Sequence, residues 1–439
     1  MKEVRRYKFL SLCVLFLMTA STVCAQAGAQ DEPARLSSRR IQYAVGLARL
    51  WSGIKQNFVF MDKVKLNWDS VYAVTLPLIE RAQSDEEATL ILQRMAALVH
   101  DGHTFVWGKD NCYQAPFTLK CLDGKVYVDA IWSSELKSQG LRRGMELLAV
   151  NDLPVKAYAE QQVVPNLSSS TPQWTEHLLY QQGELTSSPE GTVTKYTFSS
   201  GLVVNYESRK PQMDLRPKQE TYEWKVLKGG MGYLRISTFN DRKMQSLFAK
   251  LYPDIQTTKS LIIDIRHNGG GNSGNGDFIL RHLFSDSIRT DVWRTRQYNA
   301  AFASWGIQQD MYVSPPEGLA PIDGVAPYLK PVVLLVDNGT FSAAEDFTSV
   351  FKAMKRGVII GVPTGGSTGN GVRIELIPGV CTANICSKWN TCPDGTEFVG
   401  IGFKPDLPVV ETYRSYFVKN EDVYLKAAVG YLSKCRESR

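Results

Sequence analysis

Beyond residue 25 the sequence has no apolar run as long as the roughly 18 residues that a membrane-spanning helix needs. It has no Cys-x-x-Cys pair, and only His100 and His103 lie near a cysteine, so the spacing argues against a zinc site. No Gly-Lys-Ser or Gly-Lys-Thr triplet follows its glycine-rich stretches, which argues against a nucleotide-binding P-loop. We therefore expect no integral membrane span, no metal and no nucleotide loop.

The first 25 residues have the layout of a secretory signal peptide, with basic residues ahead of an apolar run at 9–18. Val23-Cys24-Ala25 offers small side chains for cleavage before Gln26, and lipid attachment at Cys24 is the alternative. Cleavage removes four basic residues and one acid, which lowers the net charge from +6 to +3. We expect a periplasmic or secreted protein with no electrostatic case for nucleic-acid binding.

Six of the eight cysteines lie beyond that segment: Cys112, Cys121, Cys381, Cys386, Cys392 and Cys435. In an oxidising compartment, the close pair Cys112 and Cys121 and the group at 381–392 suit loop disulfides. The sequence does not determine which cysteines pair.

The length of 439 residues predicts more than one domain. Residues 26–111 form an expected helical module, because Ile41, Ala44, Val45, Ala48 and Trp51 recur at helical spacing. Ser84-Asp85-Glu86-Glu87 is typical of a capped helix start. The fold class expected for the whole chain is multidomain α+β.

Short strands and turns follow. In residues 112–166, the stretch from Gly140 to Asp152 resembles a PDZ module: a small helix ends at a glycine and a strand and a tight turn come next. Residues 167–218 are expected to be a β linker region, and strands alternate with helices over 219–439, which predicts a layered α/β domain with a C-terminal helix.

Ser342 lies between the apolar strand 332–336 and an amphipathic helix. A serine at such a turn presents its hydroxyl at the sheet edge, and the helix N-terminus favours negative charge there. Both effects suit a nucleophile, although a serine before a helix is more often only an N-cap.

A second strand leads into Asp264-Ile265-Arg266-His267-Asn268-Gly269-Gly270-Gly271. Glycines let a ligand approach the backbone closely, so these amides could face a developing oxyanion. A plain strand-to-helix turn is the alternative.

These two motifs, followed by Gly402-Phe403-Lys404-Pro405-Asp406, resemble the ordered pattern of the C-terminal processing and tricorn-core serine peptidases over about residues 40–412. The resemblance implies a crotonase-like α/β catalytic domain with Ser342 as nucleophile and the amides of Gly270 and Ala343 as oxyanion donors. The lysine base of the processing branch is absent, because this chain reads Thr364-Gly365-Gly366-Ser367-Thr368.

The tricorn-like branch takes a histidine base from the N-terminal module, and Asp101-Gly102-His103 matches that position. The resemblance therefore assigns the base to His103; a structural turn histidine or a metal pair with His100 is the alternative. The branch also uses a glutamate shortly before the last motif, and Glu397 is the nearest acid, offset from the expected place. Glu345 is expected to support the turn.

We therefore interpret the chain as an exported serine endopeptidase of a Gram-negative bacterium, of the tail-specific type. We expect this enzyme to need no cofactor. Its substrate would be a polypeptide. The C-terminus of that substrate could be captured by the PDZ-like module through strand addition. Two alternatives remain open: a catalytically silent peptide- or ligand-binding protein of the same fold, and a hydrolase of esters.

Overall fold

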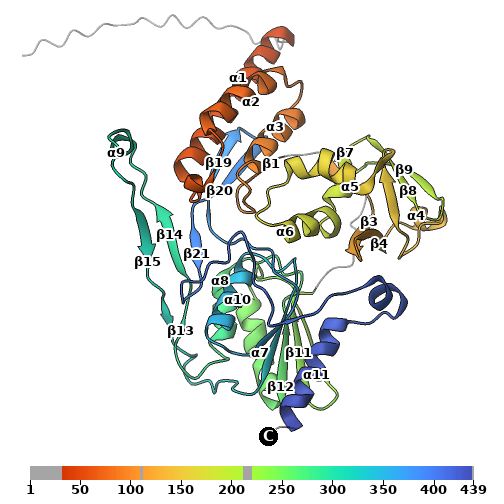
Figure 1. Ribbon diagram of the computed structural model, residues 1–439, viewed down its shortest axis with the longest axis vertical. Helices are drawn as coiled ribbons and strands as arrows, with labels where there is room; N and C mark the ends of the chain where they lie inside the picture. Colours follow the sequence, from red (N-terminus) through yellow and green to blue (C-terminus); the bar gives the residue numbers. More distant parts are fainter. Residues whose placement is uncertain (1–31, 109–111, 211–219, 438–439) are drawn as a thin grey trace, which may run out of the picture. The chain divides into compact units, whose positions relative to one another are not determined.

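The computed structural model in Figure 1 describes residues 32–108, 112–210 and 220–437. The expected signal peptide, residues 1–25, lies outside these ranges. The chain divides into two units at Arg39 and Arg40, and all contacts discussed below lie within residues 40–439.

The C-terminal part contains a six-stranded sheet. Its strands run in the order β10-β11-β12-β17-β18-β22, with β10 antiparallel to β11 and all the other neighbours parallel. Their bounds are Tyr222–Leu227, Met231–Ile236, Ser260–Asp264, Val332–Val336, Val358–Gly361 and Leu407–Pro408. Strands β11, β12, β17 and β18 are short, largely apolar runs, as expected for strands covered on both faces.

Helices pack on both faces of this sheet (Figure 1). Alternate residues of β11, β12 and β17 form one core with the helices α7 (Met244–Thr257), α8 (Ser273–Leu280) and α10 (Ala343–Ala353). The intervening residues of the same strands face α11 (Val423–Glu437), where Tyr424, Ala428 and Leu432 are buried. The parallel strands therefore end together at one edge, and ligand sites of open α/β sheets lie at this carboxyl edge.

Three helices begin the described chain: α1 (Glu32–Asn57), α2 (Trp68–Arg81) and α3 (Asp85–Ala97). The predicted capped start at Ser84 is confirmed, because its side chain accepts a hydrogen bond from the Glu87 N–H. The apolar residues that recur along α1 do not all face the core. Ile41 and Val45 are exposed, and the buried face is formed by Tyr43, Leu47, Leu50 and Ile54.

The buried face of α1 rests on a hairpin that comes from far along the chain. Strands β19 (Gly371–Ile377) and β20 (Cys381–Cys386) form a sheet with β1 (Phe105–Gly108), in the order β1-β20-β19. Figure 1 shows this late hairpin, coloured blue, among the red and orange helices. Gly53 of α1 has no side chain, and a Cβ there would lie within 2.7 Å of Ile374 and Ile385 atoms. The helix therefore approaches the hairpin closely at this glycine. The helical module and part of the C-terminal region thus share one core.

Residues 112–208 contain the middle strands. β3 (Phe117–Leu122) pairs with β4 (Lys125–Ile131), and β5 (Leu147–Val150) pairs with β8 (Val193–Phe198), which pairs with β9 (Val203–Glu207). The strands β8 and β9, from the expected linker region, therefore share a sheet and a core with the stretch expected to be PDZ-like. Short helices complete this core: α4 (Ser134–Ser138), α5 (Val155–Tyr158) and α6 (Pro172–Glu176).

The remaining strands form small sheets. They are β2 (Cys112–Gln114) with β7 (Ser187–Pro189), β6 (Leu153–Pro154) beside β5, β13 (Ile288–Arg289) with β16 (Gly318–Leu319), and β15 (Met311–Ser314), β14 (Val292–Arg296) and β21 (Trp389–Thr391) in that order. The short helix α9 (Ala300–Ser304) connects β14 to β15.

The disulfide prediction is not borne out by this structure. Cys121, Cys381, Cys386, Cys392 and Cys435 are free thiols. Cys381 and Cys386 stand five residues apart on β20, so their side chains point to opposite faces of the strand.

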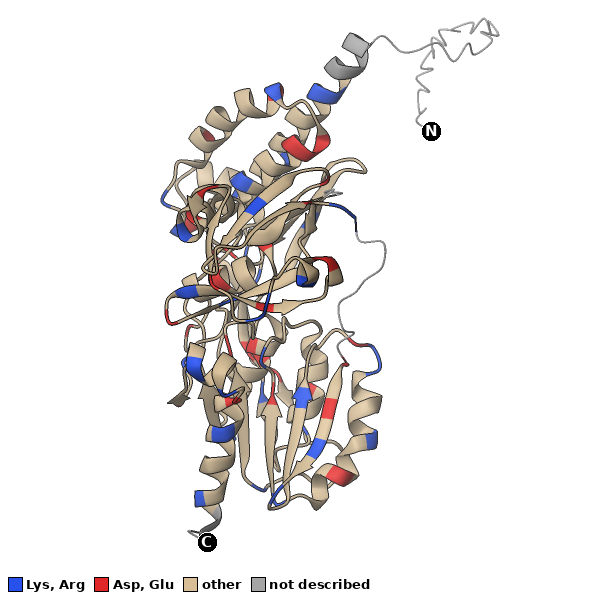
Figure 2. Cartoon of the chain, turned by 90° about the vertical axis from the view of Figure 1, so that its right-hand side faces the viewer, with Lys and Arg blue, Asp and Glu red and all other residues tan. Residues whose placement is uncertain are grey.

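Among the described residues, every helix is too short or too polar to cross a bilayer. Acidic and basic residues are interspersed over the helices and strands in the view of Figure 2.

Candidate active site

Ser342 lies at a strained turn between β17 and α10. Its backbone has φ 56° and ψ −127°, which non-glycine residues rarely adopt and which often marks a functional turn. Its side chain forms no hydrogen bond to the first turn of α10, so it is not acting as an N-cap. The next residue, Ala343, begins the helix, and its N–H has no hydrogen-bond partner within the described part of the chain.

The structure brings His103 to this turn, although the two residues are 239 positions apart. The ring nitrogen Nε2 of His103 lies 3.0 Å from Ser342 Oγ. Strand β1 begins two residues after His103 and pairs with β20, and the Asn384 side chain donates to the His103 carbonyl at 2.6 Å. Pairing between the early and late parts of the chain therefore positions the imidazole.

The His103 ring is held on its face as well as at its edge. It stacks on Phe341 with ring centroids 4.8 Å apart and planes 4° apart, and Phe341 stacks in turn on Trp174 at 3.8 Å. This enclosure removes water from the imidazole, and the resulting desolvation lowers the pKa of His103 to about 4. The ring is therefore neutral at neutral pH, as a proton acceptor must be.

The second ring nitrogen of His103 meets a residue that the sequence did not single out. Nδ1 lies 2.8 Å from Ser367 Oγ. Ser367 belongs to the stretch in which the expected lysine base is missing. A hydroxyl therefore stands where serine peptidases with a triad usually have a carboxylate.

Glu345, one helical turn after Ser342, holds the loop that carries Ser367. Its carboxylate accepts hydrogen bonds from the N–H groups of Gly366 and Ser367, at 2.9 and 2.7 Å, and from the Thr364 hydroxyl. Glu345 is fully buried, and burial raises its pKa to about 8 despite these donors. The expectation that Glu345 supports the turn agrees with these contacts.

The glycine-rich turn after β12 lies against Ser342, but the Gly270 amide is already engaged. Its N–H, expected to be an oxyanion donor, donates to Asn268 Oδ1 at 2.9 Å. Gly270 has φ +93°, and a Cβ there would lie 2.7 Å from Ser342 Cβ and 2.8 Å from Ala343 N. Glycine is needed here because a side chain would fill the space over the Ala343 amide.

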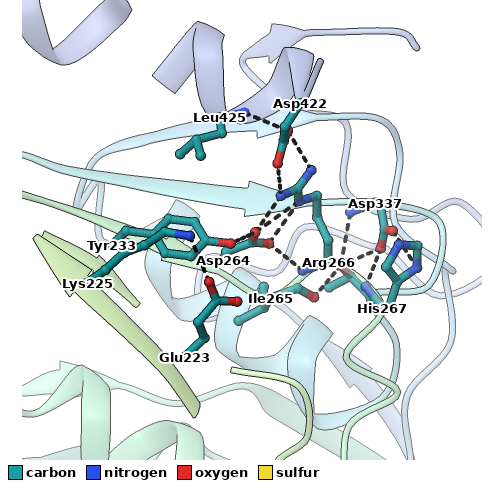
Figure 3. A network of polar contacts seen from close by, with 11 residues as sticks. Glu223, Lys225, Tyr233, Asp264, Ile265, Arg266, His267, Asp337, Asp422 and Leu425 are labelled. Atoms are coloured by element: carbon teal, nitrogen blue, oxygen red, sulfur yellow. Dashed lines mark hydrogen bonds and ion pairs between the residues drawn. The ribbon is translucent and has the colours of Figure 1, made fainter. Parts of the chain in front are cut away.

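A polar network fixes the ends of β12 and β17 (Figure 3). Arg266 pairs with Asp264 at 2.6 Å and with Asp422, at the start of α11, at 2.8 Å. Asp337 accepts the His267 N–H at 2.8 Å and pairs with its ring at 2.9 Å. Burial opposes ionisation of Asp337, but these His267 contacts outweigh it and hold the pKa of Asp337 below its ordinary value. The network ties the glycine-rich turn to the loop that precedes Ser342.

Glu397 is not brought to the site. Its side chain is 41% exposed, accepts a hydrogen bond from the Trp389 indole at 2.8 Å and lies 3.8 Å from Arg294. The expectation of Glu397 as third member is thus corrected by Ser367, which occupies the place beside His103. Within the described ranges, no three or more His, Cys, Asp or Glu side chains are grouped to hold a metal ion.

Comparison with known proteins finds that parts of this chain are similar to peptidases. Residues 230–409 match the model of peptidase family S41, and residues 42–97 match that of the tricorn protease C1 domain. A chloroplastic C-terminal processing peptidase of Tetradesmus obliquus is 32% identical over 180 residues, which are 40% of this chain and 34% of that protein. A Streptomyces coelicolor protein named as a tricorn protease homolog is 23% identical over 421 residues, which are 88% of this chain and 33% of that protein.

These alignments span about a third of the length of those relatives. The structure of mature CPAF has a TM-score of 0.69 at 17% identity, over 90% of this chain and 97% of that one, and so shares the fold. Residues 230–409 are therefore similar to the peptidase family S41 domain, and parts of the chain are similar to C-terminal processing and tricorn-type serine peptidases.

Proposed function

We propose that this protein is an exported serine endopeptidase that cleaves polypeptides through an acyl-enzyme on Ser342, with His103 as general base. The observation that carries this proposal is the 3.0 Å contact between His103 Nε2 and Ser342 Oγ at a strained strand-to-helix turn. The match of residues 230–409 to peptidase family S41 supports the reaction class. The pattern of residues 1–25 supports export.

In the first step, Ser342 Oγ attacks the carbonyl carbon of the scissile peptide bond while its proton passes to His103 Nε2. The C–N bond then breaks, and His103 gives this proton to the departing amine. Water attacks the ester that remains; His103 takes a proton from the water and returns it to Ser342 Oγ. No step requires a metal or an organic cofactor.

The oxyanion of the tetrahedral intermediate needs a hydrogen-bond donor near Ser342. The Ala343 N–H is the donor we propose, because it has no partner within the described residues and opens helix α10. The helix N-terminus adds a favourable partial charge. One such donor typically contributes about 2.7 to 4 kcal/mol of transition-state stabilisation.

A fluorophosphonate probe tests the nucleophile, because it forms a covalent bond with an activated serine hydroxyl. We expect the wild-type protein to be labelled, and both Ser342→Ala and His103→Gln to lose labelling while keeping the wild-type circular dichroism spectrum. Equal labelling of the wild type and Ser342→Ala would instead support the silent binding protein. Turnover of labelled casein against a p-nitrophenyl ester separates a peptidase from an ester hydrolase.

We further propose that residues 112–166 capture the substrate C-terminus. Strand β3 has a single paired neighbour, β4, among the described strands, and strand addition would use its other edge. A peptide with a free C-terminal carboxylate should then be cleaved faster than the same peptide with a C-terminal amide. Equal rates for the two peptides would contradict this part of the proposal.

A further inference from the structure

We propose that Ser367 is a positioning residue that fixes the proton of His103 on Nδ1, in place of a triad carboxylate. The inference rests on the proposed function of Ser342 and His103. It deepens that proposal by explaining how a site with no carboxylate bonded to the His103 ring keeps Nε2 unprotonated and directed at Ser342.

Ser367 contacts both of these residues through different atoms. Its Oγ lies 2.8 Å from His103 Nδ1, and its backbone carbonyl accepts the Ser342 N–H at 3.0 Å. Its own N–H donates to Glu345 at 2.7 Å. One residue therefore fixes the distance between the candidate base and the candidate nucleophile.

The loop around Ser367 is bound from several sides, so its hydroxyl is pre-positioned. The Gly365 N–H donates to the Thr340 carbonyl, and the Thr171 hydroxyl donates to the Gly365 carbonyl. Ser367 itself is fully buried. A buried side chain on a loop held in this way has little freedom to turn its hydroxyl away from His103.

The two tautomers of a neutral imidazole differ in which nitrogen carries the proton. When Nδ1 carries it, the N–H donates to Ser367 Oγ and the lone pair of Nε2 faces Ser342. When Nε2 carries it, His103 cannot accept the serine proton. A hydroxyl both donates and accepts hydrogen bonds. In this proposal Ser367 Oγ has the acceptor role, which leaves the lone pair of Nε2 facing Ser342, as the carboxylate does in a conventional triad.

A hydroxyl differs from a carboxylate in that it has no charge to stabilise the imidazolium. Two acids lie nearby: Asp101, whose carboxylate accepts the His103 backbone N–H, and Glu345, whose carboxylate accepts the Ser367 N–H. Neither carboxylate forms a hydrogen bond or ion pair with a ring nitrogen of His103 within the described residues; the partners of these nitrogens are Ser367 Oγ and Ser342 Oγ. The ring is thus oriented by a neutral partner, which is consistent with its lowered pKa.

The test compares wild type with Ser367→Ala, with Ser367→Thr as the variant that retains a hydroxyl. Ser349→Ala is the matched control, because Ser349 is also a fully buried serine of this domain, bonded to Asp291 and not to the site. ¹⁵N spectra of histidine-labelled protein report the tautomer, and loss of a signal in His103→Gln assigns the resonance. The rate of fluorophosphonate labelling against pH is the second readout.

We expect wild-type His103 to carry its proton on Nδ1, and Ser367→Ala to show a mixture or the Nε2 form. Labelling should fall about 10- to 100-fold, part of the 10²- to 10⁴-fold that a general base contributes. Ser367→Thr should recover most of the rate, and Ser349→Ala should keep the wild-type tautomer.

A wild-type proton on Nε2, or an unchanged tautomer and rate in Ser367→Ala, would overturn the role of Ser367 alone. Failure of Ser342 to label in the wild type would instead refute the proposed function. The spectra would still report the tautomer of His103, because they do not depend on catalysis.

Discussion

Gly102→Ala is a small change that should displace the candidate base. An added Cβ at this position would lie 2.9 Å from Phe341 Cζ and 3.3 Å from Ser367 Cβ. Gly102 does not have a left-handed backbone, so alanine is not excluded by its backbone conformation. The Phe341 ring cannot swing aside, because it is stacked between His103 and Trp174. The segment that carries His103 must therefore move outward.

The size of this movement sets the expected effect. Carbon atoms pack best at about 3.5 to 4.0 Å, so relieving a 2.9 Å approach needs a shift of about 0.6 Å. That shift would lengthen the 3.0 Å contact between His103 and Ser342 beyond the usual hydrogen-bond range. A misplacement of about 1 Å can cost about 100-fold in rate, so we expect a loss of about 10-fold, or about 1.4 kcal/mol.

The assay is the rate of fluorophosphonate labelling at pH 7.5, together with the thermal midpoint of unfolding. Gly430→Ala is the control, because Gly430 lies in α11 with no atom within 4 Å of the added Cβ. We expect this control to label like wild type and to be stabilised slightly, since alanine is favoured over glycine in helices. A folded Gly102→Ala protein that labels at the wild-type rate would refute the steric argument.

Two further predictions concern ionisable groups. Because burial lowers the pKa of His103 to about 4, labelling of Ser342 should stay constant from pH 8 down to about 5.5 and fall at lower pH; a midpoint near 9 would exclude His103 as base. Glu345→Gln replaces a carboxyl oxygen with an NH₂ group that faces N–H donors, so it should lower the free energy of unfolding in urea by about 1 to 3 kcal/mol at pH 5, and it should slow labelling. The raised pKa of Glu345, about 8, means that its contribution to stability is full below pH 4.5 and lost as pH rises through 8, so Glu345→Gln should flatten the pH dependence of unfolding in that window; an unchanged slope would contradict it.

The local features of the site could be predicted from the sequence because they depend on neighbouring residues. The apolar run of β17, the small residues after it and the amphipathic pattern of α10 together define the turn at Ser342. The cap at Ser84 is equally local. The approach of His103 was expected only from resemblance to a family, since no spacing along the chain relates it to Ser342.

The features that the sequence did not predict depend on long-range contacts. Ser367 lies in a glycine-rich stretch with no periodicity, and its role becomes visible only when His103 Nδ1 is placed 2.8 Å away. Glu397 is close to the expected position in sequence, but its side chain points to Trp389. The buried face of α1 was missed because the β19–β20 hairpin that covers it comes from more than 300 residues later.

The hairpin also explains how a base from the first module can be accurately placed. The chain leaves Ser367, forms β19 and β20, and β20 then pairs with β1, directly after His103. The same segment therefore supplies both the hydroxyl at Nδ1 and the strand that anchors the histidine backbone. Because the hairpin shares one core with the helical module, a movement of that module that carried His103 away would have to displace the short link 368–370 between Ser367 and β19. The distance between His103 and Ser342 is thus controlled by strand pairing as well as by the packing of two modules.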